Sequence, residues 1–271
     1  IQANLKIIDV VIELVDARIP WSSTNPMISQ LIGQKPSVVV LNKADLADAA
    51  VLEDWIQYYK KQGRLVIALN SKDGKGVKSL MALVRRLAAP KLEHWRARGL
   101  KNRSVRTMIL GIPNVGKSTL INKLARRSAA KTADKPGETK GKQWVHIGDQ
   151  LDLLDTPGVL WPKLENQVSA YRLAATGAIS DTVFDMETVI TQLITELSTW
   201  YPDEVKTRFK LDSLCEAPLD TIEAIGRKRG CIVAGGVVDL EKTYKLILKE
   251  YREGKIGRIS LDRVAEAGED A

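Results

Sequence analysis

Cysteine is scarce in this chain of 271 residues, which contains only Cys215 and Cys231. Two cysteines are too few for a disulfide framework, and their separation does not match the spacing of a metal site. We therefore expect two buried thiols in a reducing compartment, with a single bridge between them as the alternative. The fold must then be stabilised by a hydrophobic core.

Long hydrophobic runs are also missing. The longest apolar stretch, "IIDVVIELV" at residues 7–15, contains two acids and is far shorter than the roughly 20 residues that cross a bilayer. The first residues do not form a secretory signal pattern. The apolar content of 44% and the charged content of 27% are typical of globular domains, and the length suits one large domain or two ordinary ones.

Acidic residues are under-represented in one part of the chain. The net charge is +8, and the basic excess lies within residues 1–164, whereas residues 165–271 carry more acids than bases. Such asymmetry favours a polyanionic partner for the first part. A surface that only keeps the protein soluble is the alternative.

Strand and helix patterns alternate in the first part. Nearly continuous β-branched runs predict central strands of a parallel sheet, and the segments between them have helical periodicity. This alternation indicates an α/β fold, with a mostly parallel six-stranded sheet covered on both faces. The expected strands are 7–15, 37–41, 64–69, 106–111, 142–147 and 150–154, and the expected helices are 25–33, 48–61, 76–88 and 117–127.

After residue 165 the pattern is helical, with four amphipathic stretches and no convincing strand. We therefore predict two domains, residues 1–164 and 165–271, the second small and all-α. The end of the chain, "AEAGEDA", is expected to be a frayed acidic tail.

The phosphate loop is predicted at "GIPNVGKST", residues 111–119, after an apolar strand and before a helix. Its glycines allow the backbone N–H groups to face phosphate oxygens, and the following helix adds the positive end of its dipole. Lys117 would neutralise the β- and γ-phosphates, and the Ser118 hydroxyl would hold Mg²⁺. The expected nucleotide contacts here are Pro113, Asn114, Val115, Gly116, Lys117, Ser118 and Thr119.

Two further motifs complete the predicted phosphate and metal site. In "DTPG", residues 155–158, Asp155 would reach Mg²⁺ through water and the Gly158 N–H would face the γ-phosphate. Thr139, in the preceding basic segment, is the candidate switch threonine that closes on Mg²⁺ when a γ-phosphate is present. A plain basic surface loop is the alternative for that segment.

The base loop is predicted at "NKADL", residues 42–46. The Asp45 carboxylate can accept from N1–H and the exocyclic amine of guanine, a donor pair that adenine lacks. Asn42 would link the base to the phosphate loop, and the Lys43 stem would lie over the purine. The second base loop, "LNSKDG" at residues 69–74, would offer the backbone N–H of Ser71 or Lys72 to guanine O6.

These motifs occur in a rotated order, with both base loops before the phosphate loop. No contact requires a particular chain order, because the motifs meet at the carboxyl ends of parallel strands. We therefore predict a circularly permuted GTPase domain, in which a basic, loop-like linker at residues 89–106 joins the two permuted parts. The helical domain would follow the "DTPG" switch region directly.

In this order, "LVDARIP", "NKAD", "GIPNVGKSTLIN", "PGETK" and "DTPGVLWPK" resemble the ribosome biogenesis GTPase A family. "LAATGAI" and "AIGRKRGC" resemble its helical C-terminal domain, so the match covers nearly the whole chain. The resemblance implies a cytoplasmic bacterial factor, or an organellar matrix one, for late assembly of the large ribosomal subunit. It also implies GTP hydrolysis to GDP with Mg²⁺, stimulated by ribosomal particles, and contact with ribosomal RNA. We expect a monomer without membrane contact.

The resemblance also bears on hydrolysis. Asn114 matches a position that potassium-stimulated relatives use to hold K⁺, and a simple turn-stabilising role is the alternative. Val159 stands where Ras-like enzymes place a water-orienting glutamine, as in the family. Family members also begin with a segment whose histidine is proposed to assist hydrolysis, but His94 and His146 match no such motif. The sequence therefore supports nucleotide binding more directly than hydrolysis.

Some assignments stay open on the sequence alone. Asp16 and Arg18 of "LVDARIP" are explained most simply by an exposed ion pair at a strand end. "GRKRG", residues 226–230, is either an RNA contact or a solvated helix end. An RNA-binding scaffold that binds GTP without effective hydrolysis is the second candidate function. A signalling GTPase is a third, although no lipidation cysteine supports it.

Overall fold

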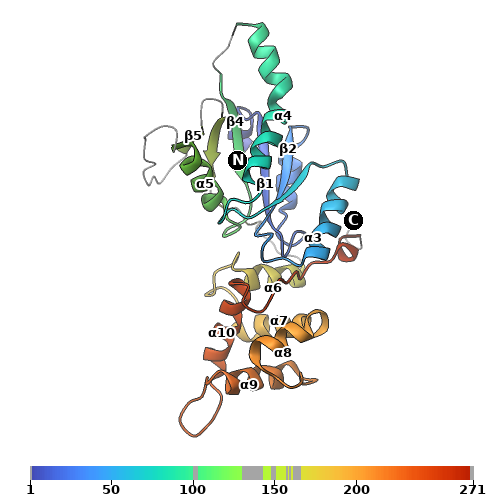
Figure 1. Cartoon of the computed structure of the whole chain (residues 1–271), viewed down its shortest axis with the longest axis vertical. Helices are drawn as coiled ribbons and strands as arrows, with labels where there is room; N and C mark the ends of the chain where they lie inside the picture. The colour runs from blue at the N-terminus through green and yellow to red at the C-terminus, as the bar shows by residue number, and fades with distance from the viewer. Residues whose placement is uncertain are drawn as a thin grey trace.

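The computed structural model describes residues 2–99, 103–129, 143–147, 151–156, 158, 160 and 166–268. Helices surround a sheet at one end of the elongated molecule, and a second group of helices, α6 to α10, lies at the other end (Figure 1). Among the described residues, no helix combines the length and apolar character that crossing a bilayer requires.

The sheet has six strands in the order β3-β2-β1-β4-β6-β5, and only β5 is antiparallel to its neighbour. This architecture confirms the predicted mostly parallel sheet. The strands are β1 (Val10–Asp16), β2 (Ser37–Asn42), β3 (Val66–Leu69), β4 (Val105–Leu110), β5 (Gln143–Ile147) and β6 (Leu151–Asp155).

Strand β1 shows why the apolar runs form a central sheet. All seven residues of "VVIELVD" are buried, and alternate side chains belong to separate core clusters. Val10, Ile12 and Leu14 pack on one face, and Val11 and Val15 pack on the other. Because the strand is covered on both faces, it needs apolar side chains at almost every position.

The helices that flank the sheet alternate with strands β1 to β4 in the sequence. They are α1 (Gln2–Leu5), α2 (Pro26–Ile32), α3 (Ala49–Lys61), α4 (Val77–Ala97) and α5 (Lys117–Ala129).

Helix α4 corrects the predicted linker. We expected residues 89–106 to be loop-like, but α4 continues through Pro90 to Ala97 and extends beyond the sheet (Figure 1). Trp95 is buried near the end of this extension, with the Arg103 guanidinium 4.3 Å from its ring centroid. A buried aromatic ring under a cation stabilises the last turns despite the hydrogen bond lost at Pro90.

The second group contains α6 (Gln167–Thr176), α7 (Met186–Trp200), α8 (Pro202–Phe209), α9 (Pro218–Lys228) and α10 (Leu240–Arg252). Side chains of Asn166, Asp185 and Asp239 cap the N-termini of α6, α7 and α10. The four predicted helical stretches are confirmed. Helix α8 was not predicted, because eight residues are too few for a clear periodic pattern.

The expectation for the cysteines is half right. Both thiols are free, and Cys231 is buried as expected, but Cys215 is exposed.

The end of the chain returns to the sheet. The 3₁₀ helix η2 (Val264–Gly268) packs on α3, where Ala267 is only 1% exposed. The red helical turn at the end of the described chain accordingly lies beside α3 in Figure 1. A frayed tail from residue 265 was therefore the wrong expectation for residues 265–268. The division into domains at residues 164 and 165 stays a prediction.

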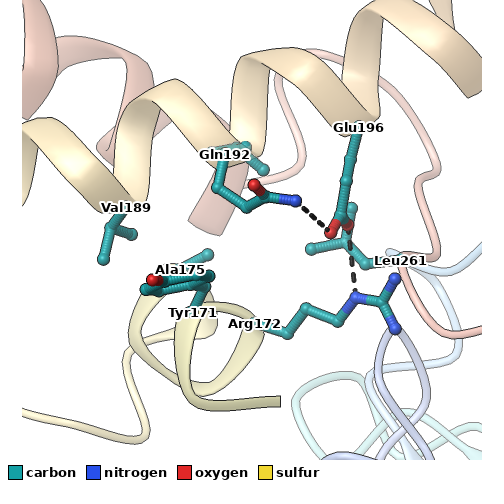
Figure 2. A pocket seen from close by; sticks show the side chains of 8 residues that line it. Tyr171, Arg172, Ala175, Val189, Gln192, Glu196 and Leu261 are labelled. Carbon is teal, nitrogen blue, oxygen red and sulfur yellow. Dashed lines mark hydrogen bonds and ion pairs between the residues drawn. The ribbon is translucent and has the colours of Figure 1, made fainter. Parts of the chain in front are cut away.

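Asp262 anchors this return. Its carboxylate is fully buried and accepts hydrogen bonds from Ser22 N and Ser22 Oγ, both at 2.7 Å, and from Arg172 Nη1 at 3.1 Å. Its carbonyl oxygen accepts from Trp55 Nε1 of α3 at 3.3 Å. Arg172 of α6 also donates to Glu196 of α7 (Figure 2). Through its carboxylate and its backbone carbonyl, this one residue thus connects the loop after β1, a helix beside the sheet and the second helical group.

We predict a pH dependence of stability at this anchor. Burial raises the pKa of Asp262 to about 6 from its ordinary 3.8, against the opposing effect of Arg172 and the Ser22 hydrogen bonds. Between the two pKa values, the folded protein keeps the Asp262 proton while the unfolded chain releases it. The stability that this proton contributes is lost as the pH rises through about 6. The free energy of unfolding, relative to Asp262→Asn, should fall by roughly 2–3 kcal/mol between about pH 4 and 7.

Urea denaturation of both proteins across this pH range measures the difference between their free energies of unfolding. The other titrating groups are common to both proteins, so their effects cancel in this difference. A difference that stays constant with pH would contradict the raised pKa.

Candidate functional site

The predicted phosphate loop connects β4 to α5. Gly116 has a φ of +106°, and a Cβ built there would lie 2.3 Å from Nδ2 of Asn42. Glycine is required at this position because both the backbone conformation and the close approach of Asn42 exclude a side chain.

Lys117 begins α5 and is only 7% exposed. Its Nζ donates to the carbonyl oxygens of Gly111 and Ile112, at 3.1 and 2.7 Å. The ammonium therefore lies inside the curve of the phosphate loop. Ser118 and Thr119 follow on the first helical turn, and both are exposed. The loop has the form of an anion site at a helix N-terminus.

Asn42 joins the base loop to the two neighbouring loops. Its Nδ2 donates to Val115 O of the phosphate loop at 2.7 Å. Its Oδ1 accepts from Ser71 N at 3.0 Å and from Ser71 Oγ at 2.7 Å. The side chain is 2% exposed. Three segments that are far apart in the sequence therefore meet on one buried amide.

In the second base loop, both predicted backbone donors have partners within the protein. The N–H groups of Ser71 and Lys72 both donate inside the protein, to Asn42 Oδ1 and to Asn70 Oδ1 at 2.8 Å. A contact from either one to guanine O6 would have to share or replace such a bond. Ser71, Lys72 and Thr119 also line one open depression of about 620 Å³ between this loop and α5.

Buried ion pairs at the end of β1 hold the base loop in place. Asp16 Oδ2 accepts from Lys43 Nζ and from Arg18 Nη2, each at 2.8 Å. Asp16 and Arg18 are both 2% exposed, so the expectation of an exposed ion pair was wrong. The nearby Arg18 and Lys43 cations overcome the effect of burial and lower the pKa of Asp16. The pair thus remains ionised and holds Lys43, whose φ is 59°.

Asp45, the predicted base reader, is exposed at the tip of this loop. Within the described part of the chain, its carboxylate makes no hydrogen bond or ion pair. The carboxylate is therefore available to a ligand.

Gly158 of the "DTPG" motif lies against the phosphate loop. A Cβ built at Gly158 would lie 2.7 Å from the backbone of Pro113 and 2.8 Å from Lys117 Nζ. Only glycine permits this approach. Next to it, the Thr156 hydroxyl donates to Ile109 O in β4 and fixes the motif to the sheet. The structure thus brings together Pro113, Lys117 and Gly158 as predicted from their motifs.

Asn114 contacts the second helical group. It has a φ of 55°, and its Nδ2 donates to Gly177 O, at the C-terminal end of α6, at 2.7 Å. An amide that donates through Nδ2 retains Oδ1 as an acceptor or cation ligand. This contact to α6 was not predicted.

The predicted metal ligands are only partly visible. Thr139, Val159 and the side chain of Asp155 lie outside the described residues. In the part that is described, no cluster of three or more His, Cys, Asp or Glu side chains could hold a metal ion. Ser118 places an exposed hydroxyl on the first turn of α5, beside Lys117, which fits an Mg²⁺ ligand next to bound phosphates.

One residue near the site had no signal in the sequence. Arg258 donates through Nε to Ala47 O at 2.8 Å and through Nη2 to Ala44 O at 3.1 Å. No local pattern indicates a contact between residues more than 200 positions apart.

The sheet order, the phosphate loop, the base loop and "DTPG" together define a circularly permuted P-loop GTPase fold. A family profile described as 50S ribosome-binding GTPase matches residues 106–209. Ribosome biogenesis GTPase A of Priestia megaterium is 48% identical over 97% of this chain and 92% of its own length. The chain belongs to the ribosome biogenesis GTPase A family.

More distant relatives and solved structures agree. Mitochondrial ribosome-associated GTPase 1 of Mus musculus is 31% identical over 97% of this chain and 86% of its own. A GDP-bound structure of TM YlqF matches with a TM-score of 0.72 and 27% identity, over 97% of this chain and 98% of that one. A GNP-bound YlqF from T. maritima matches with a TM-score of 0.70 and 27% identity, covering 97% and 95% of the two chains.

We predict that Asn42→Ala loosens the site and destabilises the fold. The substitution leaves buried groups of Ser71 and Val115 without their partner, and each such group costs about 1–3 kcal/mol. Chemical denaturation should show a loss of roughly 2–4 kcal/mol in the free energy of unfolding. Asn122→Ala, on the exposed surface of α5, is the matched control and should change it by less than about 0.5 kcal/mol. Equal effects of the two variants would contradict the bridging role of Asn42.

Proposed function

We propose that this protein is a GTP-binding and GTP-hydrolysing switch in late assembly of the large ribosomal subunit, with turnover stimulated by the ribosomal particle. The observation that carries the proposal is the Asn42 bridge, which joins the base loop, the second base loop and the phosphate loop around one site. Relatives named as ribosome biogenesis GTPases, and GDP- and GNP-bound structures of a relative, support it.

The nucleotide would lie across the loops that Asn42 connects. Asp45 accepts from guanine, and the Lys43 stem covers the purine while its ammonium stays paired with Asp16. The phosphate groups occupy the loop from Pro113 to Thr119, where backbone N–H groups and the start of α5 favour anions. Lys117 exchanges its loop carbonyl partners for phosphate oxygens.

Two cations complete the proposed site. Mg²⁺ would be held by Ser118, Thr139 and Asp155, with Asp155 acting through water. K⁺ would be held by Oδ1 of Asn114, whose Nδ2 is engaged by Gly177 O. Both ions add positive charge beside the phosphates, where charge develops during hydrolysis.

Hydrolysis would use Lys117, Thr139 and the Gly158 N–H to stabilise charge on the γ-phosphate. Gly158 supports this role because its backbone lies against the phosphate loop. Val159 has no polar group to orient the attacking water, so we expect slow turnover until a particle supplies or orders further groups.

The proposed partner is the large ribosomal subunit, contacted through RNA and protein. The basic excess in residues 1–164 favours a polyanion, and "GRKRG" offers exposed Arg227 and Lys228 at the end of α9. We propose a monomer in the bacterial cytoplasm, without membrane contact. Because one relative is named as mitochondrial, an organellar matrix is the alternative location.

A scaffold that binds GTP without effective hydrolysis remains the second candidate. Val159 favours it, because the position lacks the usual water-orienting amide.

We predict that large subunits increase the rate of GTP hydrolysis, and increase it more in KCl than in NaCl. The physical reason is that K⁺ fits the Asn114 site and adds positive charge near the scissile bond. The measurement is phosphate release in each salt, with and without purified large subunits. Small subunits at equal RNA mass are the control. Tight GTP binding with no turnover under any condition would support the scaffold instead.

We predict that Asp45→Asn shifts nucleotide preference from GTP toward xanthosine triphosphate. The amide can donate to the additional carbonyl of xanthine, whereas it no longer accepts from both guanine donors. Competition binding against a fluorescent nucleotide measures the ratio of affinities, which should move by at least about tenfold. Exposed Asp73→Asn, in the second base loop, is the control. Unchanged GTP affinity in Asp45→Asn would remove Asp45 from base reading.

A further inference from the structure

A distant part of the chain, residues 254–262, makes hydrogen bonds to the base loop and to the two residues after it. We term residues 254–262 the returning segment. Arg258 donates to Ala47 O at 2.8 Å and to Ala44 O at 3.1 Å. Ile259 N donates to Leu46 O at 2.8 Å. Asp48 N, at the N-cap of α3, donates to Ser260 Oγ at 3.1 Å. Three consecutive residues of the returning segment therefore bind four groups of residues 44–48.

The returning segment is itself firmly placed. Ile259, Ser260 and Leu261 are at most 1% exposed. Tyr201 OH accepts from Ser260 N and donates to Ser260 O, both at 3.1 Å. Leu261 N donates to Arg18 O at 2.9 Å. The segment is thus a rigid support, because its backbone groups are satisfied by both the sheet end and the second helical group.

The two ends of the segment are also fixed. At its start, Gly254 has a φ of +70°, and a Cβ built there would lie 2.6 Å from Cδ2 of Leu46. At its end, the buried Asp262 carboxylate is bound by Ser22 and Arg172. Both ends therefore leave little freedom for the segment to shift away from the base loop.

The position of the Asp45 side chain is set by the backbone of the base loop. Its carboxylate has no hydrogen bond or ion pair with another described residue, and its side chain is exposed. The two carbonyl groups that Arg258 binds, at Ala44 and Ala47, lie on either side of Asp45 in the chain. A single planar guanidinium that donates in two directions fixes both at once, which an ammonium group cannot reproduce.

We propose that Arg258 is a positioning residue for guanine recognition, which holds the base loop so that the Asp45 carboxylate meets the donor pair of guanine. The inference rests on the proposed base-reading role of Asp45. It makes the returning segment part of the proposed nucleotide site, because the segment acts through the base loop that it holds. Base recognition then depends on the docking of the end of the chain against the sheet.

The test compares guanosine diphosphate with inosine diphosphate, which lacks the 2-amino group that Asp45 would bind. Arg258→Ala should lower the ratio of the two affinities about tenfold, because a mobile carboxylate gains less from the amine. Arg258→Lys keeps the positive charge but not the fixed pair of donors on the planar guanidinium. Its affinity ratio should therefore fall between those of Arg258→Ala and the unaltered protein. Thermal unfolding of each variant shows whether the fold is kept.

Lys255→Ala is the matched control, because it removes an exposed positive charge of the same segment that pairs with Glu253 and not with the base loop. Its affinity ratio should equal that of the unaltered protein. An Arg258→Ala protein with an unchanged ratio, including one that binds both nucleotides equally less well, would overturn the proposal. Asp45→Ala tests the base-reading role of Asp45 separately from the positioning role of Arg258. If Asp45→Ala does not lower the affinity ratio, the base-reading role of Asp45 itself is wrong.

Discussion

The buried carboxylate of Asp262 is the contact on which the arrangement of the molecule depends. It is bound by Ser22 after β1 and by Arg172 of α6, while its carbonyl oxygen accepts from Trp55 of α3. A buried charge is tolerated only where several donors surround it, and here those donors come from the loop after β1 and from α6. This anchor fixes the end of the returning segment, whose preceding residues bind residues 44–48.

The second helical group and the returning segment that follows it therefore contact the phosphate end and the base end of the proposed nucleotide site. At the phosphate end, Asn114 donates to Gly177 O at the end of α6. At the base end, the returning segment binds residues 44–48. The rotated order of motifs makes this possible, because the chain leaves the sheet after "DTPG" and comes back past the base loop. A ligand that orders either loop has a direct route to helices that lie outside the sheet (Figure 1).

The sequence predicted the elements whose signals are local. Apolar runs identified all six strands, and the glycines, Lys117 and Ser118 identified the phosphate loop, because backbone conformation and helix polarity depend on nearby residues. The contacts made by Arg258 and Asp262 were not predictable, since they join segments from 90 to 240 residues apart. Helix α4 passed through Pro90 because burial of Trp95 outweighed a local signal, and the burial of Asp16 and Arg18 depends on packing that no short pattern records.

Hydrogen–deuterium exchange with and without GDP tests most directly whether the base loop and the returning segment form one unit. Ile259 N and Asp48 N donate across the contact, so their exchange reports on it from both sides. The account predicts that GDP slows exchange in residues 44–48 and 258–261 together. Slower exchange in residues 44–48 alone, with residues 258–261 unchanged, would contradict it.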